Sequence, residues 1–219
     1  FSFQPRYEQM RLRLSRVPGS LLANIETGEH RDVRVACIGE TDFELALAQH
    51  RNPRIPPLHA AIVKMDEDAI FAFLDGGVDP NDVDTSGRNA LHALAFFHAT
   101  CSVPLAQKVL EMIEDVNLQD RDGYTALMNA VMSRSLIMFE ELLKESDKVR
   151  LDLQDNAGQT ALHIAASKDH EVWVKALIEQ GADVNLKDAG GLTPLRLARS
   201  KGSNRSLPIL TQATGEGTE

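Results

Sequence analysis

Histidines are the side chains of this sequence best suited to bind a metal ion or to transfer protons near neutral pH, and the chain has seven of them. Three of them, His59, His92 and His163, each follow a leucine directly. His98 and Cys101 lie close together in sequence, but no second pair accompanies them to complete the four ligands of a zinc site. We therefore expect neither a metal ion nor a cofactor.

Paired carboxylates are the other candidates for chemistry, because two such groups can share acid–base work. Asp66 with Asp68, and Glu140 with Glu141, are such pairs, but neighbouring and alternate positions on a helix point in different directions. We therefore interpret these acidic pairs as parts of solvent-exposed helix surfaces. The sequence also contains no Walker loop and no GxGxxG, GxSxG or HExxH pattern. These observations predict a protein without enzymatic activity, with an enzyme in the N-terminal residues 1–40 as a remote alternative.

The net charge of the chain indicates which kinds of partner it can bind. Thirty-two acidic and 23 basic side chains give a formal charge of −9, which repels the phosphates of nucleic acid and favours a protein partner with a basic surface. No apolar run reaches the roughly 18–20 residues of a membrane-spanning helix. Cys37 and Cys101 do not make a disulfide framework. The chain begins at Phe1 rather than Met, which fits a trimmed chain or an exported protein without its signal, so its location stays open.

A repeated phrase organises the chain, and a fixed period changes the interpretation of every residue inside it. Separations of 33, 36, 35 and 33 residues lie between the five leucines Leu58, Leu91, Leu127, Leu162 and Leu195. Seven residues before four of these leucines the pattern Asp-x-x-Gly begins, at residues 84–87, 120–123, 155–158 and 188–191. A closing signature appears as Gly77-Val78-Asp79-Pro80-Asn81 and again as Gly181-Ala182-Asp183-Val184-Asn185.

These residues resemble the ankyrin repeat family over roughly residues 51–205. The resemblance implies that His59, His92 and His163 form hydrogen bonds with the backbone of the adjoining loop. It also implies a binding protein whose loops and first helices make a concave surface. Both are expectations carried over from the family.

The physical chemistry of the phrase can be read independently of the resemblance. In Asp-x-x-Gly the carboxylate can accept hydrogen bonds from nearby amides and the glycine can take a positive φ, which predicts a hairpin-like finger. Thr125, Thr160 and Thr193 stand where a helix would begin, and Pro57 and Pro194 suit the first helical position. Short helix pairs cannot bury both faces alone, so neighbours must stack. The predicted fold is an all-α solenoid of about five repeats with short β-hairpin-like fingers.

The chain is expected to divide at the repeat boundaries. We place an N-terminal extension over residues 1–50, with a capping helix near Phe43 to Leu47. The repeats follow at residues 51–83, 84–119, 120–154 and 155–187, with a C-terminal cap at 188–205. Residues 206–219 are expected to form a flexible tail. Insertions near 98–103 and 146–150 are expected in loops.

The family's variable positions give the candidate binding residues. Carried over to this sequence, they are Arg88, Phe96, Phe97, Arg121, Tyr124, Met132, Ser133, Gln159, Ser167, Lys168 and Leu192. Phe97, Arg121 and Tyr124 are the favoured anchors, because aromatic and Arg side chains often dominate interfaces. The alternative for Phe96 or Phe97 is packing beneath the neighbouring inserted loop.

The sequence thus predicts a monomeric, non-enzymatic protein-binding module. A rigid blocker, inhibitor or self-protection partner of another protein is favoured, because no other module accompanies the repeats. The alternative is a secreted effector or a scaffold that captures a host or regulatory protein.

Overall fold

The computed structural model describes residues 56–97, 101–145 and 147–215. Within this part of the chain the backbone forms ten helices and no strand. They are α4 (Pro57–Lys64), α5 (Glu67–Asp75), α6 (Ala90–Phe97), α7 (Val103–Met112), α8 (Ala126–Ser133), α9 (Leu136–Lys144), α10 (Ala161–Ser167), α11 (Glu171–Glu179), α12 (Pro194–Lys201) and α13 (Ser206–Thr214). The predicted all-α repeat fold is confirmed.

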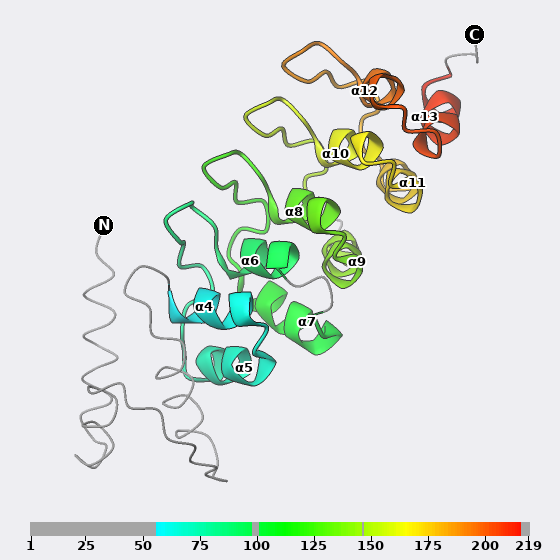
Figure 1. The fold of residues 1–219 in the computed structure, drawn as a ribbon. Coiled ribbons are helices and arrows are strands. Elements are labelled where there is room, and N and C mark those ends of the chain that lie inside the picture. Colours follow the sequence, from blue (N-terminus) through cyan, green and yellow to red (C-terminus); the bar gives the residue numbers. More distant parts are fainter. Residues whose placement is uncertain (1–55, 98–100, 146, 216–219) are drawn as a thin grey trace, which may run out of the picture.

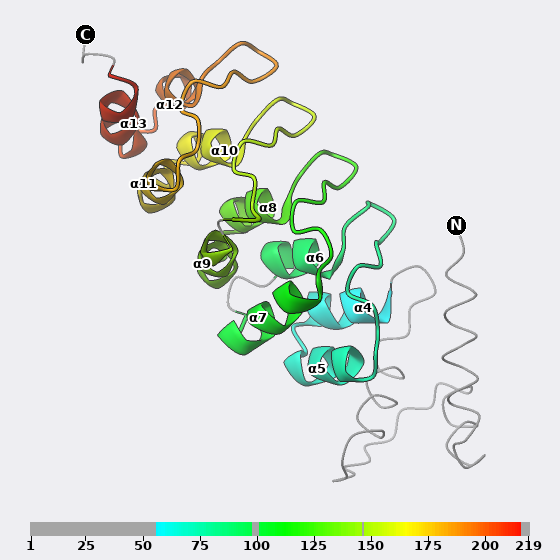
Figure 2. The same ribbon diagram turned by 180° about the vertical axis from the view of Figure 1, so that it is seen from behind.

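The helices form five successive pairs, and each pair packs on the next. Figures 1 and 2 show the first helices of the pairs (α4, α6, α8, α10 and α12) in one row and the second helices in another. The fingers project from the side of the first helices (Figure 1). Contacts link α4 to α6, α6 to α8, α8 to α10 and α10 to α12. Because each pair contacts mainly its neighbours, the described residues form a solenoid.

Helix ends lie at the residues that the sequence pattern indicates. Thr125, Thr160 and Thr193 cap α8, α10 and α12, and each hydroxyl accepts a hydrogen bond from an amide in the first turn. Pro194 occupies the first turn of α12. After α11, Gly181 takes a φ of +92°, the left-handed conformation that ends a helix.

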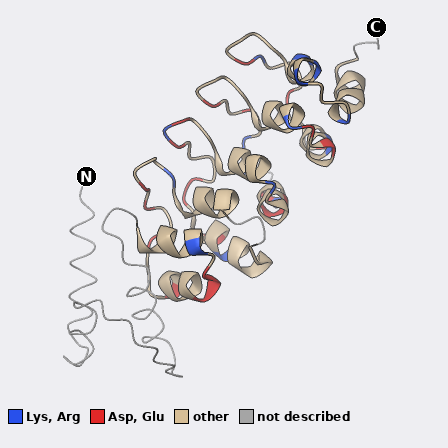
Figure 3. Ribbon diagram, in the orientation of Figure 1, with Lys and Arg blue, Asp and Glu red and all other residues tan. Residues whose placement is uncertain are grey.

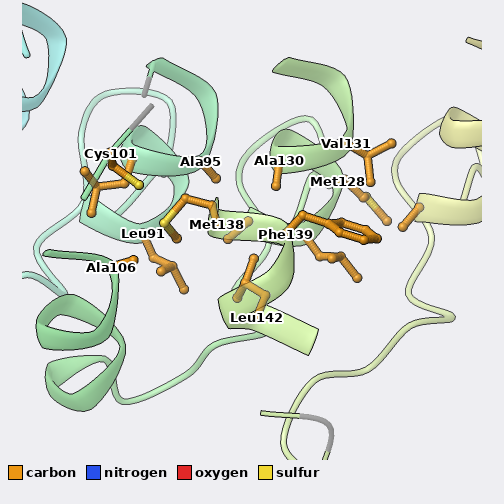
Figure 4. Close-up of a cluster of buried hydrophobic side chains, with 14 of the residues drawn as sticks. Leu91, Ala95, Cys101, Ala106, Met128, Ala130, Val131, Met138, Phe139 and Leu142 are labelled. Atoms are coloured by element: carbon orange, nitrogen blue, oxygen red, sulfur yellow. The ribbon is translucent and has the colours of Figure 1, made fainter. Parts of the chain in front are cut away.

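Small side chains on the first helices and large ones on the second helices fill the space between the pairs. Ala95 and Ala130 are fully buried, so neighbouring first helices approach closely. In Figure 4, Met138 of α9 points toward Ala95 while Phe139 points the other way. The ring of Phe139 stacks on that of Trp173 in α11, with centroids 4.9 Å apart. One helix thus contacts the pairs on both sides of it.

The C-terminal boundary predicted at residue 205 is wrong, because Ser206–Thr214 forms helix α13 rather than a flexible tail. α13 packs on α11 and α12, and its Leu210 is fully buried. The polar residues before it form the turn between two helices: the Asp169 carboxylate accepts hydrogen bonds from the amides of Arg205 and Ser206 at 2.9 and 2.8 Å. The fifth unit is therefore a complete helix pair.

Several expectations lie outside the described residues. These are the extension over residues 1–50 with its capping helix, the first finger, and the inserted residues 98–100 and 146. Cys101, by contrast, is described: it is a buried free thiol, and burial raises its pKa to about 11. A thiol of that pKa is not a nucleophile at neutral pH.

Candidate protein-binding face

Each finger is shaped by the aspartate that begins it. One carboxylate oxygen of Asp120 accepts hydrogen bonds from the amides of Asp122 and Tyr124 at 3.0 and 2.9 Å. The carboxylate of Asp84 adds an ion pair with Arg88 at 2.8 Å. Burial opposes ionisation of Asp84, but the hydrogen bonds from Arg88 and Ser86 outweigh it and lower the pKa of this carboxyl. The expected turn chemistry is confirmed.

Backbone hydrogen bonds join each finger to the next. The amides of Arg121, Asn156 and Ala189 donate to carbonyl oxygens of the preceding finger at 2.9, 3.0 and 2.9 Å. The fingers approach so closely that a Cβ on Gly158 would lie 2.5 Å from the Ala189 nitrogen. The fingers of the second to fifth units therefore form one continuous ribbon with a fixed register.

The three repeated histidines hold this ribbon on the helices, as the family resemblance implied. Each Nε2 lies within hydrogen-bond distance of a finger carbonyl: His59 of Arg88 at 2.7 Å, His92 of Tyr124 at 3.0 Å and His163 of Leu192 at 3.0 Å. Burial lowers the pKa of all three histidines. In His163, Nδ1 accepts a hydrogen bond from the Thr160 amide at 3.2 Å, so Nε2 carries the proton and donates.

These bonds also position candidate binding residues. The carbonyls that the histidines bind belong to Arg88, Tyr124 and Leu192, which were selected from sequence as variable surface positions. The imidazoles therefore act as positioning groups for the fifth residue of three fingers. Gln159 is the fifth residue of the fourth finger and has no histidine partner. The third unit, which would supply that histidine, has Met128 directly after its repeat leucine instead.

The candidate residues form two rows, and the surface between the two rows is called the groove below. The finger row holds Arg88, Arg121, Tyr124, Gln159 and Leu192, and the second row lies at the C-terminal ends of the first helices. That second row is formed by Phe96, Phe97, Met132, Ser133, Ser167 and Lys168. The Arg88 guanidinium carbon lies 5.9 Å from the centre of the Phe97 ring, so a finger and a helix end meet across the groove.

The candidates differ in how much side chain they offer to a partner. Arg121 and Lys168 are exposed, and Phe96 is 40% exposed with its ring edge-to-face against Phe97 at 5.0 Å. Phe97 and Tyr124 are half-buried and pack against the core. Burial and nearby carboxylates, Asp155 first, raise the pKa of the Tyr124 hydroxyl, so it stays protonated.

The serines in the second row form hydrogen bonds within the protein. Ser133 Oγ donates to the Ala95 carbonyl at 2.5 Å, and Ser167 Oγ donates to the Ile164 carbonyl at 2.9 Å. Ser133 thereby ties the end of α8 to α6. These serines stabilise helix ends, and Met132 beside Ser133 packs partly against the core.

Sequence reasoning missed two exposed apolar residues in the first unit. Val63 and Met65 are 48% and 53% exposed at the end of α4. Val63 follows Leu58 by five residues, as Phe96 follows Leu91. Counting from the repeat leucine would have found Val63, whereas the irregular Arg51–Arg54 segment in place of Asp-x-x-Gly drew attention away from this unit.

Other kinds of site are not supported within the described ranges. No group of three or more His, Cys, Asp or Glu side chains there could hold a metal ion. Every described helix is too short or too polar to cross a bilayer. In the described part of the chain, the candidate residues lie in the fingers and at the ends of the first helices.

Comparisons with known proteins agree with this architecture. A family model described as ankyrin repeats matches in three overlapping copies, at residues 58–152, 97–188 and 141–216. The B-cell lymphoma 3 protein homolog of Mus musculus is 26% identical over 187 residues, covering 69% of this chain and 41% of that protein. The putative ankyrin repeat protein FPV230 of Fowlpox virus is 29% identical over 139 residues, covering 64% and 71%. NF-kappa-B inhibitor alpha of Gallus gallus is 30% identical over 123 residues, covering 48% and 39%.

Proposed function

Because the chain belongs to the ankyrin repeat family and is a protein–protein interaction module, we propose that it acts as a rigid, non-enzymatic blocker of another protein. The groove between the finger ribbon and the helix ends is the proposed binding surface. Its proposed anchors are the exposed Phe96 and Arg121 and the half-buried Phe97 and Tyr124. Inhibition or self-protection follows if the bound partner surface includes that partner's own functional site.

Rigidity supports this proposal. The fingers are joined by backbone hydrogen bonds of 2.9–3.0 Å and are fixed to the helices through buried histidines. A surface that is ordered before binding loses little conformational entropy on association, so more of the contact energy appears as affinity. A preformed groove suits a blocker, because its partner must adapt to it rather than the reverse.

The relatives give a second line of support. One of them is named an inhibitor of NF-kappa-B, and the chain spans 39% of its length. Other relatives are much longer: the chain matches 16% of the Gallus gallus NF-kappa-B p105 subunit and 12% of the human Rabankyrin-5. Repeat stacks inside such long proteins favour the second candidate function, a scaffold that captures a regulatory or host protein.

The proposal includes a monomeric chain and a charged partner. The formal charge of −9 favours a partner with a basic surface, since long-range attraction depends on total charge. A partner seated in the groove, however, meets the local charges there, and at physiological salt charges beyond about 8 Å are screened. The charge of the groove itself therefore decides which partner binds.

A capture experiment separates the blocker from the scaffold. The full chain is immobilised and its partner is recovered from the native organism, and the partner's own activity is then measured with increasing amounts of the chain. A blocker abolishes that activity at one equivalent, and the loss disappears with Phe96→Ser. A partner that stays fully active in the complex would favour the scaffold and overturn the blocker.

A further inference from the structure

The helix-end side of the groove carries the opposite charge from the chain as a whole. Two sets of positions are compared for charge. The finger row comprises the second, third and fifth residues of each described finger, and the helix-end row comprises the fifth and sixth residues after each repeat leucine. These positions hold Lys64, Arg88, Arg121, Lys168 and Lys201 against a single acidic residue, Asp122. The aspartates that begin the fingers add negative charge to the finger row, where their carboxylates accept hydrogen bonds from their own fingers' amides. The helix-end row, by contrast, holds Lys64, Lys168 and Lys201 at these positions and no acidic residue.

Three of these cations are available to a partner. Arg88 is neutralised by Asp84 at 2.8 Å. Arg121, Lys168 and Lys201 are exposed, and no described acidic side chain forms an ion pair with any of them. Figure 3 shows the basic residues of α12, at the end of the stack where Lys201 lies.

The exposed apolar side chains of the groove lie at the end of the stack formed by the first two units. Val63 and Phe96 are 48% and 40% exposed at the ends of α4 and α6. Lys168 and Lys201 lie at the ends of α10 and α12. With neighbouring helices about 10 Å apart, roughly 20–30 Å separates Phe96 from the two lysines. An extended segment of about 6–9 residues spans that distance.

We propose that the groove binds a protein segment that carries apolar side chains at one end and a cluster of Asp or Glu at the other. The apolar end lies over Val63 and Phe96, and the acidic end lies beside Lys168 and Lys201. This inference rests on the proposed function, because it assumes that the groove is the binding surface. It replaces the basic partner favoured by net charge with an acidic one favoured by local charge.

Selection from a displayed library of random twelve-residue peptides tests the proposal with the full chain as bait. The enriched peptides are expected to combine Asp or Glu with Leu, Ile, Phe or Trp, separated as the groove separates its two ends. The strongest peptide is then synthesised, and its affinity is measured by fluorescence anisotropy at two salt concentrations. We expect affinity to fall as salt rises, because exposed charges contribute.

Four variants test which residues of the chain bind the peptide. Lys168→Glu with Lys201→Glu, and separately Phe96→Ser, should each weaken the peptide about tenfold or more, since each removes one end of the contact. The matched controls are Lys175→Glu and Val172→Ser on α11, where Lys175 is exposed and Val172 is 71% exposed. Both controls should bind within about twofold of the parent, because α11 belongs to the row of second helices and not to the proposed binding surface.

Each outcome decides between the two proposals. Enriched peptides that are basic, or that bind Lys168→Glu with Lys201→Glu as tightly as the parent yet lose affinity with Phe96→Ser, would overturn the acidic partner and leave the groove as the site. Peptides that are insensitive to all the groove variants would overturn the groove itself, and the proposed function with it. A selection that enriches nothing would overturn recognition of a short segment.

Discussion

The fourth unit follows the repeated phrase closely, whereas the second departs from it where the groove is most apolar. α10 begins with Thr160 and His163 capping each other's backbone, and it ends in small or charged residues. α6 ends in Phe96 and Phe97, and about three extra residues follow before α7. The comparison suggests a division of tasks: the regular unit stabilises the stack, and the irregular unit supplies the apolar surface for recognition.

The largest effect is expected from removing the support of the regular unit. Deletion of residues 188–219 removes α12 and α13, which cover α10 and α11. Because each unit depends on its neighbours for burial, the truncated chain should aggregate. Size-exclusion chromatography with light scattering measures this. A soluble monomer whose melting temperature equals that of the full chain would contradict the account.

A smaller loss of stability should distinguish the fingers of the two units. In Gly158→Ala the new Cβ would lie 2.5 Å from the Ala189 nitrogen, in addition to strain at a φ of +74°. We expect a loss of about 3 kcal/mol or more. Gly87→Ala in the second unit meets its nearest atom at 3.4 Å, and Gly181→Ala meets none within 4 Å.

These two controls should lose only about 1–2 kcal/mol, the usual cost of a left-handed alanine. Urea denaturation of all three variants gives the free energies of unfolding. Equal losses in the three would show that the close approach of the fingers does not stabilise the fourth unit.

The buried histidines should contribute next. His163→Ala leaves the Leu192 carbonyl without its imidazole donor, and His92→Ala does the same to Tyr124. Each change should lower the free energy of unfolding by about 1–3 kcal/mol. Metal analysis is the decisive companion measurement. Stoichiometric zinc in the parent that is lost in either variant would replace the structural role with a ligand role.

The pH dependence of stability follows from the same residues. Burial places the folded-state pKa of His59, His92 and His163 below the unfolded value of about 6.5, so the unfolded chain binds more protons. Their contribution is therefore complete above pH 6.5 and is lost as pH falls through the folded-state pKa values. Thermal unfolding from pH 7.5 to 5 should show this loss, and His163→Ala should weaken the slope. A stability that rises toward pH 5 would be inconsistent with neutral buried imidazoles.

The repeat fold could be predicted from sequence because its signals are local. A threonine before a helix, or an aspartate three residues before a glycine, acts through hydrogen bonds to its own neighbours. The fifth unit was misjudged because Ser203, Asn204 and Arg205 read as an unstructured polar run. Their order depends on the carboxylate of Asp169, 36 and 37 residues away from its two amide partners. Sequence patterns contain no record of such distant contacts.

The groove was predicted only in part, for a related reason. Position in the repeat assigns a residue to a face, but burial depends on what the neighbouring units place beside it. Tyr124 was favoured as a binding anchor, yet it packs partly against the core, so Tyr124→Ala would perturb folding as well as binding. Total charge likewise did not indicate that Arg121, Lys168 and Lys201 are exposed in a finger and at two helix ends. Arg121 and Phe96 are the cleaner probes, because both are exposed.

Titration calorimetry with the captured partner tests most directly whether the groove is the binding surface. The parent is compared with Arg121→Glu, Phe96→Ser and the control Lys175→Glu on α11 at about 50 and 200 mM salt, with circular dichroism as a check on folding. The account predicts that both groove variants lose about 1–2 kcal/mol or more, that the loss from Arg121→Glu is greater at low salt, and that the control binds like the parent. If both groove variants bind like the parent while changes within residues 1–40 abolish binding, the groove is the wrong site.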